Sequence, residues 1–436
     1  MTIEPKILKG FRDFLPADEI TRRNLIEKIE SSFRMYGFVP IDTPALEYTE
    51  ILLGKGGGET EKQIYRFTDN GGRDVALRFD LTVPFARFLA EHRASLSFPF
   101  KRYHIAKVWR GENTQRGRYR EFTQCDFDTI GSDSAAADFE ILLIMRNTLH
   151  AIAGENVTIH INHRGIFNSF LSRLELSEKT VDILRTVDKL AKSGRDETLR
   201  NLSEITGNNK AEEILRFIES SGSFEEILAA MKNAAGPSSC FERLEQIHNH
   251  MIDTGISGSF VLDPSITRGL DYYTGVVFES FFTDLPGIGS VCSGGRYDNL
   301  VALYTSDKRL PPLTGVGASI GIDRLIAALE ALGKLETKNS YAQTAIAWVS
   351  GAAGGACQAL GEKLRKAGIP CEVFLDEEKI TKQFQLAEKK GIRWLVIPNS
   401  VDPSGGTITL RDLSKRENRE GLDTKEIIDM LIRGRQ

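Results

Sequence analysis

Residues 103–131 read YHIAKVWRGENTQRGRYREFTQCDFDTIG, and this stretch decides how the chain is organised around its chemistry. Its β-branched and aromatic residues predict strands over 103–110 and 120–129, and the polar run 111–117 predicts a loop between them. Successive side chains of a strand point to opposite faces, so the returning strand gathers its polar residues and one aromatic ring on a single face. These residues are Arg120, Phe122, Gln124, Asp126 and Asp128.

This hairpin carries side chains that suit a phosphate and a base. A guanidinium donates two parallel hydrogen bonds to phosphate oxygens and stays charged. The Phe122 ring offers a stacking surface, and Gln124 and Asp128 offer acceptors for an ammonium or an imidazole N–H. The alternative is a surface hairpin with cross-strand salt bridges. The arginines concerned are Arg110, Arg116, Arg118 and Arg120.

A second alternating segment, LRFDLT at residues 77–82, also predicts a strand. Period two places Arg78, Asp80 and Thr82 on one face and the apolar residues on the other. The polar face is either solvated or, together with the hairpin, part of a site.

Two glycine-rich segments follow later in the chain. TRGLDYYTG at residues 267–275 sets two tyrosines between glycines behind an arginine; the alternative is an aromatic hairpin with a structural arginine. GVGASIGIDRL at residues 315–325 predicts a glycine-lined strand running into a helix, where a flat base approaches the backbone and Arg324 reaches a phosphate. Its spacing is not that of the dinucleotide-binding G-x-G-x-x-G motif. The alternative is close packing of a helix on a strand.

Composition is that of an ordinary globular protein, with 41% hydrophobic and 27% charged residues. The net charge of -4 means that any nucleic-acid contact must come from local basic clusters. The five cysteines are scattered and never spaced C-x-x-C, which argues against a disulfide framework and a structural zinc site. The histidines lack metal-ligand spacing, so we expect no protein-bound metal. We also expect no membrane span and a cytoplasmic location.

The chain divides into three zones by pattern. Strands and helices over 1–330 predict a first domain, and the helical periodicity over about 168–255 predicts a helical insertion within it. The polar stretch 331–340 is the expected linker. Strands that alternate with helices over 341–436 predict a small α/β domain.

Together these segments resemble the class II aminoacyl-tRNA synthetases, and specifically the histidyl-tRNA synthetase family, from end to end. Class II motifs 2 and 3 would indicate only the class, whereas the two histidine signatures name the amino acid. The similar stretches are 9–16 (the family's opening K-G-x-R-D-x-x-P), 37–47 (motif 1), 110–128 (motif 2), 268–275 and 293–298 (the histidine signatures) and 315–324 (motif 3).

The resemblance implies an α+β catalytic domain, with an antiparallel sheet flanked by helices and a helical insertion, plus a C-terminal α/β anticodon-binding domain. It implies a homodimer that attaches L-histidine to tRNA(His) through a histidyl-adenylate, using ATP with its bound Mg²⁺. One alternative is a non-catalytic regulatory subunit that senses histidine for ATP phosphoribosyltransferase. Such relatives lose ATP-site arginines, but this chain keeps Arg110, Arg268 and Arg324. Another is a ligase for a different amino acid, against which RGLDYYTG argues.

The resemblance also implies a role for each matching residue. Those implied to bind histidine are Asp80, Leu81, Thr82, Gln124, Asp128, Arg268, Tyr272 and Tyr273. Those implied to bind ATP are Arg110 (α-phosphate), Arg324 (γ-phosphate), Phe122 (adenine), Arg118 and Tyr119. Arg110 and Arg268 are the implied catalytic residues, with Arg268 stabilising charge at the α-phosphorus. Gln115 and Arg116 are implied to lie near the acceptor end of the tRNA.

Overall fold

The chain forms two compact units, each with its own sheet. The units are Met1–Arg12 with Leu25–Leu335, and Asp13–Asn24 with Glu336–Gln436. Every expected site residue that the structure describes belongs to the larger unit. The computed structural model describes residues 2–54, 59–188, 190–266, 272–305, 311–349, 354–399 and 407–434.

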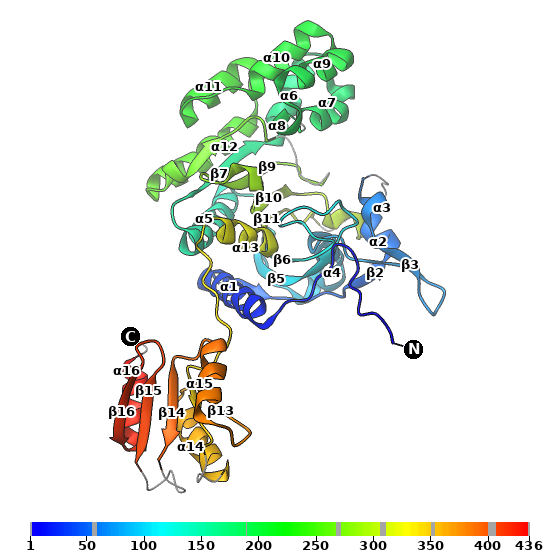
Figure 1. Ribbon diagram of the computed structural model, residues 1–436. Helices are drawn as coiled ribbons and strands as arrows, with labels where there is room; N and C mark the ends of the chain where they lie inside the picture. The colour runs from blue at the N-terminus through cyan, green and yellow to red at the C-terminus, as the bar shows by residue number, and fades with distance from the viewer. Residues whose placement is uncertain are drawn as a thin grey trace. The chain divides into compact units, whose positions relative to one another are not determined.

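A mixed eight-stranded sheet forms the centre of the larger unit (Figure 1). Its order is β1-β5-β6-β11-β10-β9-β7-β8. From β5 to β7 neighbouring strands pair antiparallel, as expected, whereas the outermost strands β1 and β8 pair parallel with β5 and β7. The strands are β1 (Val39–Pro40), β5 (Phe100–Trp109), β6 (Glu121–Ile130), β7 (Val157–His163), β8 (Phe260–Leu262), β9 (Val276–Phe282), β10 (Cys292–Tyr297) and β11 (Gly315–Gly321).

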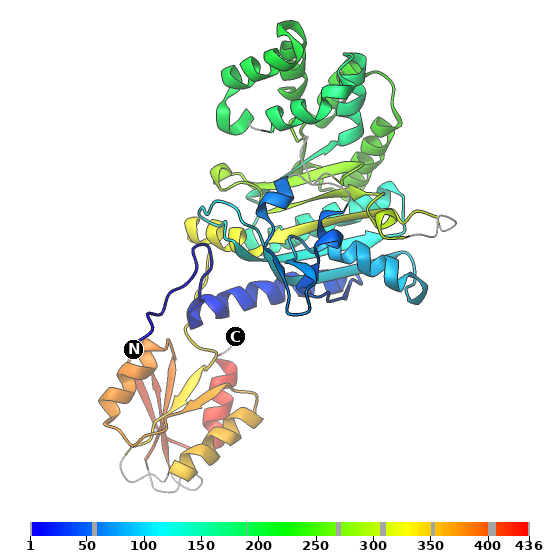
Figure 2. The same ribbon diagram turned by 90° about the vertical axis from the view of Figure 1, so that its right-hand side faces the viewer.

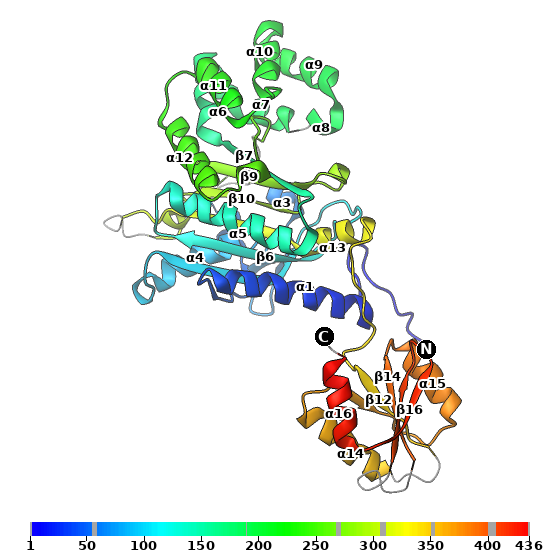
Figure 3. The same ribbon diagram turned by 90° about the vertical axis from the view of Figure 1, so that its left-hand side faces the viewer.

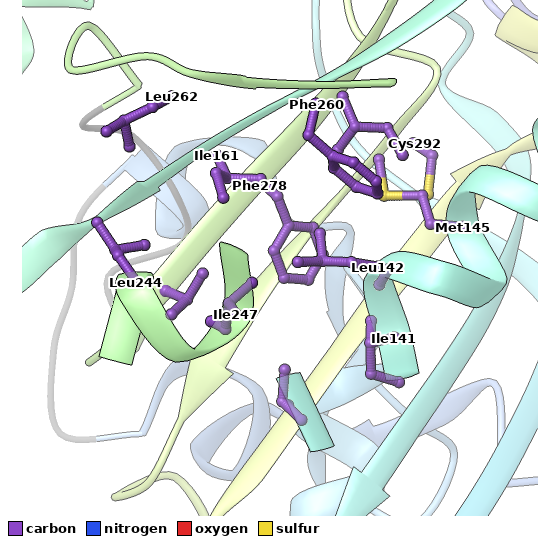
Figure 4. Packing of buried hydrophobic residues seen from close by; sticks show 14 of the residues in the cluster. Ile141, Leu142, Met145, Ile161, Leu244, Ile247, Phe260, Leu262, Phe278 and Cys292 are labelled. Atoms are coloured by element: carbon purple, nitrogen blue, oxygen red, sulfur yellow. The ribbon is translucent and has the colours of Figure 1, made fainter. Parts of the chain in front are cut away.

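One face of this sheet packs against helices and holds the main hydrophobic core (Figure 3). Phe33 lies against Phe127 of β6, with ring centroids 4.7 Å apart. Phe278 of β9 points toward Leu142 and Ile247 (Figure 4). Since this face is filled, the site residues of β6 lie on the other face. The covering helices are α5 (Ala135–Ala153), α12 (Ser239–Asp253), α13 (Ile322–Ala331) and, from Leu25 onward, α1 (Pro16–Met35).

A small three-stranded sheet, in the order β2-β4-β3, precedes α4, which packs on the site face of the large sheet. Phe85 of α4 lies in one buried cluster with Ile130 of β6 and Tyr297 of β10. The elements are β2 (Leu46–Tyr48), α2 (Thr49–Leu53), α3 (Glu59–Gln63), β3 (Arg66–Thr68), β4 (Asp74–Leu77) and α4 (Thr82–His92).

The strand expected over residues 77–82 is wrong. Strand β4 ends at Leu77 and helix α4 begins at Thr82, so the segment is a turn between them. Arg78 and Asp80, expected on a polar face, are as buried as the apolar residues between and after them. Because the segment is enclosed on every side, its burial does not alternate along the chain. A short polar/apolar pattern cannot distinguish such an enclosed turn from a half-buried strand.

The chain between β7 and β8 forms helices throughout its described part, as the helical periodicity predicts. These helices, green in Figures 1 and 2, gather beyond the end of the sheet that carries β7. Phe170 and Phe217 stack between two of them, with ring centroids 4.2 Å apart. The helices before α12 are α6 (Arg164–Arg173), α7 (Thr180–Val187), α8 (Leu190–Ser193), α9 (Arg195–Thr206), α10 (Asn208–Ile218) and α11 (Phe224–Ala235).

The smaller unit holds a five-stranded sheet in the order β13-β12-β14-β15-β16. Its first strands alternate with helices, as expected, and they pair parallel. Strands β15 and β16 and the last helix were not predicted. Strand β16 pairs antiparallel at the edge, and its charged, exposed residues hide it from a hydrophobicity pattern. The elements are β12 (Thr344–Ile346), α14 (Gly354–Lys366), β13 (Cys371–Val373), α15 (Ile380–Lys389), β14 (Trp394–Pro398), β15 (Ile408–Asp412), β16 (Glu417–Leu422) and α16 (Thr424–Arg433).

Candidate active site

Asp80 lies in the turn before α4 and fixes the start of that helix. Its Oδ1 accepts hydrogen bonds from the backbone N–H groups of Thr82 at 3.1 Å and Val83 at 2.9 Å. Burial raises the pKa of the Asp80 carboxyl, while the Val83 N–H and the Arg110 guanidinium oppose the shift. Leu81 is fully buried beside it. The turn therefore presents one rigidly held carboxylate at the N-terminus of a helix.

The even-numbered residues of β6 share one face, as the alternation predicts for this strand. Gln124 pairs in register with Gly321 of β11, and Asp126 with Ser319. The Gln124 side-chain amide donates to Ser319 Oγ at 2.9 Å. Its buried Oε1 has no hydrogen-bond partner within the described residues. Gln124 thus offers a free buried acceptor, the kind of group that needs a ligand donor.

Two acidic residues follow Gln124 on this face. Burial raises the pKa of Asp126 to about 7, because desolvation and the nearby Asp128 carboxylate outweigh the Arg102 guanidinium. Burial also raises the pKa of Asp128. Asp128 Oδ1 accepts from the Tyr297 hydroxyl at 2.5 Å, and Oδ2 lies 2.7 Å from Arg102 Nη2. Both Asp128 oxygens therefore have a partner within the fold.

Three tyrosines form the wall beside Asp128. The Tyr272 and Tyr273 rings meet edge to face at 5.0 Å, and Tyr272 meets Tyr297 at 5.9 Å. Burial raises the pKa of all three hydroxyls, so they are neutral donors near neutral pH. A side chain on Gly295 of β10 would sit 2.9 Å from Tyr273 Cδ1, so this glycine makes room for the ring.

Arginines gather where β5, β6 and α13 meet. The Arg110 guanidinium lies 4.4 Å from the Phe79 ring centroid and 5.2 Å from that of Phe122. Burial and, to a smaller extent, the neighbouring Arg118 charge lower the pKa of Arg324 to about 10. Positive groups this close, with few acids among them, favour an anionic ligand. Glu112, 3.9 Å from Arg110 Nη1 and 3.7 Å from Arg118 Nη1, is one of those acids.

The N-terminal arm, which carries Arg12, contacts both the β5–β6 loop and the start of α13. Arg12 forms an ion pair with Asp323, and its Cζ lies 3.6 Å above the Tyr119 ring. The other Asp323 oxygen accepts from the backbone N–H of Thr123 at 2.9 Å. One carboxylate therefore fixes the start of α13, and with it Arg324, against β6 and the arm.

The tip of the β5–β6 loop stands apart from this arrangement. Gln115 and Arg116 are exposed, and a backbone bridge between Gln115 and Arg118 closes the turn. Arg116 lies 3.4 Å from Glu330 of α13. Arg120, expected with the phosphate-binding arginines, instead donates from Nε to the Glu112 carbonyl and from its backbone N to the Gly10 carbonyl.

Two of the three β11 glycines serve a purpose other than the expected approach of a base. A side chain on Gly317 would overlap Asp128 Oδ1, and one on Gly315 would lie 2.7 Å from the Tyr297 ring. At Gly321, by contrast, the nearest atom is the Val291 carbonyl oxygen at 3.8 Å. Gly321 therefore leaves open space, whereas Gly315 and Gly317 make room for the Tyr297 ring and the Asp128 carboxylate.

Arg268, expected to be catalytic, lies outside the described residues, which resume at Tyr272. Sequence reasoning missed Arg102, Ser319 and the role of Tyr297. Arg102 and Ser319 each contact a predicted residue across a strand pair, whereas Tyr297 of β10 reaches Asp128 past β11, which lies between β10 and β6. A signal existed for Tyr297, which stands inside the second histidine signature, but the register that brings Arg102 to Asp128 was not readable.

Within the described ranges, no group of three or more His, Cys, Asp or Glu side chains could hold a metal ion. All five cysteines are free thiols. No helix of the described residues is long and apolar enough to cross a membrane.

Comparison with known proteins agrees over both units. The sequence model of the family described as "Histidyl-tRNA synthetase" matches residues 10–325, and the one described as "Anticodon binding domain" matches residues 343–433. The histidine–tRNA ligase of Treponema denticola is 56% identical over 399 residues, which are 90% of this chain and 88% of that protein.

Solved structures show the same relationship. The crystal structure of histidyl-tRNA synthetase from Nostoc sp. PCC 7120 is similar with a TM-score of 0.87 at 30% identity, covering 99% of this chain and 100% of that one. An ATP phosphoribosyltransferase regulatory subunit/histidyl-tRNA synthetase from Bacillus halodurans C shares the fold, with a TM-score of 0.72 at 21% identity over 88% of this chain and 97% of that one. From the family match and the close relatives, this chain belongs to the histidyl-tRNA synthetase family.

Proposed function

We propose that this chain attaches L-histidine to tRNA(His) in two steps, both at the site between α4 and the face of β6. The observation that carries the proposal is the order of side chains along β6. Phe122, beneath the Arg110 guanidinium, is followed on the same face by the free Gln124 acceptor and then by Asp128. Such a row suits a nucleotide phosphate at one end and a cationic amino acid at the other.

In the first step a carboxylate oxygen of histidine attacks the α-phosphorus of ATP. The bond from that phosphorus to the bridging oxygen breaks, and pyrophosphate leaves with the electron pair. Arg110 would hold the α-phosphate and Arg324 the γ-phosphate, with Arg118 and Tyr119 assisting. Catalysis then rests on positioning and on charges already in place. We assign the charge that develops at the α-phosphorus to Arg110 and Arg268.

Histidine would be recognised by buried polar groups. Its α-ammonium would lie among Asp80, Thr82 and Gln124, and its imidazole between Asp128 and Tyr273. Leu81 and Tyr272 would line the space. A side chain without the imidazole nitrogens would leave the Asp128 acceptor and the Tyr273 hydroxyl unpaired, and such a loss discriminates far more strongly than a missing methylene.

The nucleotide brings Mg²⁺ with its phosphates. Glu112 and Glu279, the acids whose charges act on Arg324, are the groups of this chain that would approach the ion. Carboxylate oxygens are suitable ligands for Mg²⁺. Phe122 would stack on adenine, and the open space at Gly321 would admit the base edge.

In the second step a ribose hydroxyl at the 3′ end of the tRNA attacks the carbonyl carbon of the adenylate, and AMP leaves. Gln115 and Arg116, at the exposed loop tip, would approach the acceptor end. The C-terminal unit, which matches an anticodon-binding family over residues 343–433, would bind the anticodon. We further propose a homodimer formed through residues 37–47, in the cytoplasm.

The test is ATP–pyrophosphate exchange with each of the twenty amino acids, followed by charging of tRNA(His). Exchange with histidine alone is expected. Gln124→Leu should raise the KM for histidine at least about tenfold, because it removes a buried acceptor. Gln385→Ala, at an exposed position of α15, is the matched control. Folded protein that exchanges with no amino acid would favour the regulatory alternative, and exchange with another amino acid would overturn the assignment of the pocket.

A further inference from the structure

Arg102 of β5 is fully buried at the bottom of the proposed histidine pocket. It lies opposite Asp128 in the β5–β6 register, with Nη2 2.7 Å from Asp128 Oδ2. Its Cζ lies 4.0 Å from the Phe85 ring centroid. Moving a guanidinium out of water is costly, so a burial this complete calls for a specific compensating interaction.

Hydrogen bonds do not supply that compensation. Apart from the ion pair with Asp128, no guanidinium nitrogen of Arg102 has a hydrogen-bond partner among the residues that the structure describes. Arg78 is nearly as buried, but it donates to the backbone carbonyls of Lys107 and Thr43. An arginine that serves only the fold is expected to be satisfied in the manner of Arg78.

Charge supplies the compensation instead. Arg102 is the cation shared by three buried carboxylates, and it opposes the effect of burial on the pKa of Asp126, Asp128 and Asp80. His104, two residues along the same face, adds no second cation. Burial first, and then the Arg102 charge, lower the pKa of His104 to about 4.

Both oxygens of Asp128 have a partner within the fold, yet the carboxylate keeps some acceptor capacity for a ligand. Oδ2 faces Arg102, while Oδ1 accepts from the Tyr297 hydroxyl and lies against Gly317. An ionised carboxylate has about four acceptor positions, so Oδ1 can accept one more N–H, whereas a protonated carboxyl loses part of this capacity. The titratable groups that act on Asp128 are Arg102 of β5, Asp126 of β6, Asp80 before α4, Tyr273 and Tyr297 of β10.

We propose that Arg102 is a positioning residue for histidine specificity: it keeps Asp128 ionised and oriented so that Asp128 accepts the imidazole N–H, without touching the substrate itself. This inference rests on the proposed function. Removing Arg102 would raise the pKa of Asp128 further, so more of the carboxyl would be protonated at neutral pH. Histidine binding in such a variant should therefore weaken at pH 7 and recover as the pH rises.

The experiment measures pyrophosphate exchange against histidine concentration from pH 7.0 to about 8.5, where free imidazole is largely neutral. Arg102→Leu should raise the KM for histidine about tenfold or more at pH 7 and lose much of that increase at the higher pH. The KM for ATP should stay unchanged, and Arg102→Lys should partly restore the histidine KM. Wild-type protein run in parallel corrects for ionisation of the substrate.

Arg78→Leu is the matched control, because it removes a nearly as buried arginine whose hydrogen-bond partners are backbone carbonyls. It should lower the melting temperature without a pH-dependent change in the histidine KM. If Arg102→Leu does not fold, the double variant Arg102→Leu/Asp128→Asn removes both partners, a change that buried ion pairs often tolerate. Its histidine KM should match that of Asp128→Asn at every pH.

The outcomes separate the two proposals. Wild-type protein that fails to exchange with histidine contradicts the proposed function. If wild-type exchange is normal, two results for Arg102→Leu would contradict the role of Arg102. One is an increase in the histidine KM that does not change with pH, and the other is an increase in the KM for ATP. A double variant that is clearly weaker than Asp128→Asn would also contradict it, since Arg102 would then act by another route.

Discussion

Arg12 forms an ion pair with Asp323, which joins the N-terminal arm to the first turn of α13. The Asp323 side chain is 3% exposed, and that of Arg12 is 28% exposed. Because Asp323 precedes Arg324 and also accepts the Thr123 N–H, the arm stabilises the position of an arginine assigned to the ATP phosphates. The opening K-G-F-R-D stretch thus contributes to the site from outside the sheet.

Replacing Arg12 with Ala should weaken ATP use more than histidine use. We expect a several-fold higher KM for ATP, a smaller change for histidine, and a stability loss of about 1–3 kcal/mol, because Asp323 loses a charged partner. Kinetics and thermal unfolding measure both effects. A double-mutant cycle with Asp323→Asn should give a coupling energy of at least about 0.5 kcal/mol. Strictly additive single effects would contradict a working ion pair.

Substitutions at two glycines of β11 should affect the two substrates separately. In Gly317→Ala the new methyl group would displace the Asp128 carboxylate, so the KM for histidine should rise at least about tenfold, or 1.4 kcal/mol, with little change for ATP. Gly321→Ala is the matched substitution, in a part of the strand with open space. It should fold normally and affect ATP rather than histidine. Equal effects of both variants on both substrates would argue against this division.

His163 gives a defined pH dependence of stability. Burial and the Arg243 charge lower its pKa from the ordinary 6.5 to about 4, and Nδ1 accepts the Gly165 N–H at 3.1 Å. The unfolded chain therefore binds the proton more readily, so stability is complete above pH 6.5 and decreases as the pH falls toward 4.

His163→Asn keeps a helix-capping acceptor but does not titrate. The difference in unfolding free energy between wild type and this variant should be constant above about pH 7. Below pH 6.5 it should fall by up to about 1.4 kcal/mol per pH unit, because the other titrating groups cancel in the comparison. Denaturant unfolding at several pH values measures it, and a constant difference down to pH 5 would refute the assignment.

Gln383 is expected to stabilise the smaller unit. It is buried, and its side chain accepts from the Trp348 N–H at 2.9 Å and donates to the Trp348 and Glu378 carbonyls. Gln383→Leu would leave these groups unsatisfied at a cost of about 1–3 kcal/mol each. Charging of tRNA should fall while pyrophosphate exchange persists. Gln385→Ala, exposed on the same helix, should leave both reactions near wild type. Loss of exchange in Gln383→Leu would contradict the separation of the two units.

Elements with long, regular patterns were predictable from sequence. The helix that contains Phe33, the strands that carry Tyr103 and Gln124, and the glycine-lined β11 all lie where periodicity and composition place them. Each has a buried face that repeats over several residues, so local sequence and tertiary environment agree. The row of residues along β6 was predictable for the same reason.

Features that depend on pairing were not predictable. The turn at Asp80 is enclosed on all sides, so its burial does not alternate as it would in a half-exposed strand. Arg102 reaches Asp128 only through a register that the long β5–β6 loop leaves undefined. Tyr297 reaches the same carboxylate from β10, far along the chain. No local pattern in the sequence predicts the contact of Asp128 with Arg102 or with Tyr297.

The pairing of β6 with β11 has a consequence for how the protein is made. Strand β6 emerges from the ribosome long before β11, because the whole helical segment between β7 and β8 separates them. Until Gly317 arrives, the Asp128 carboxylate has no strand beside it on that side, and β6 remains an edge open to other chains. The candidate active site is therefore among the last parts of the larger unit to assemble during synthesis, as expected for contacts between distant segments. A nascent or truncated chain that ends before β11 would already contain the helices that precede β11, yet it would lack one wall of the proposed histidine pocket.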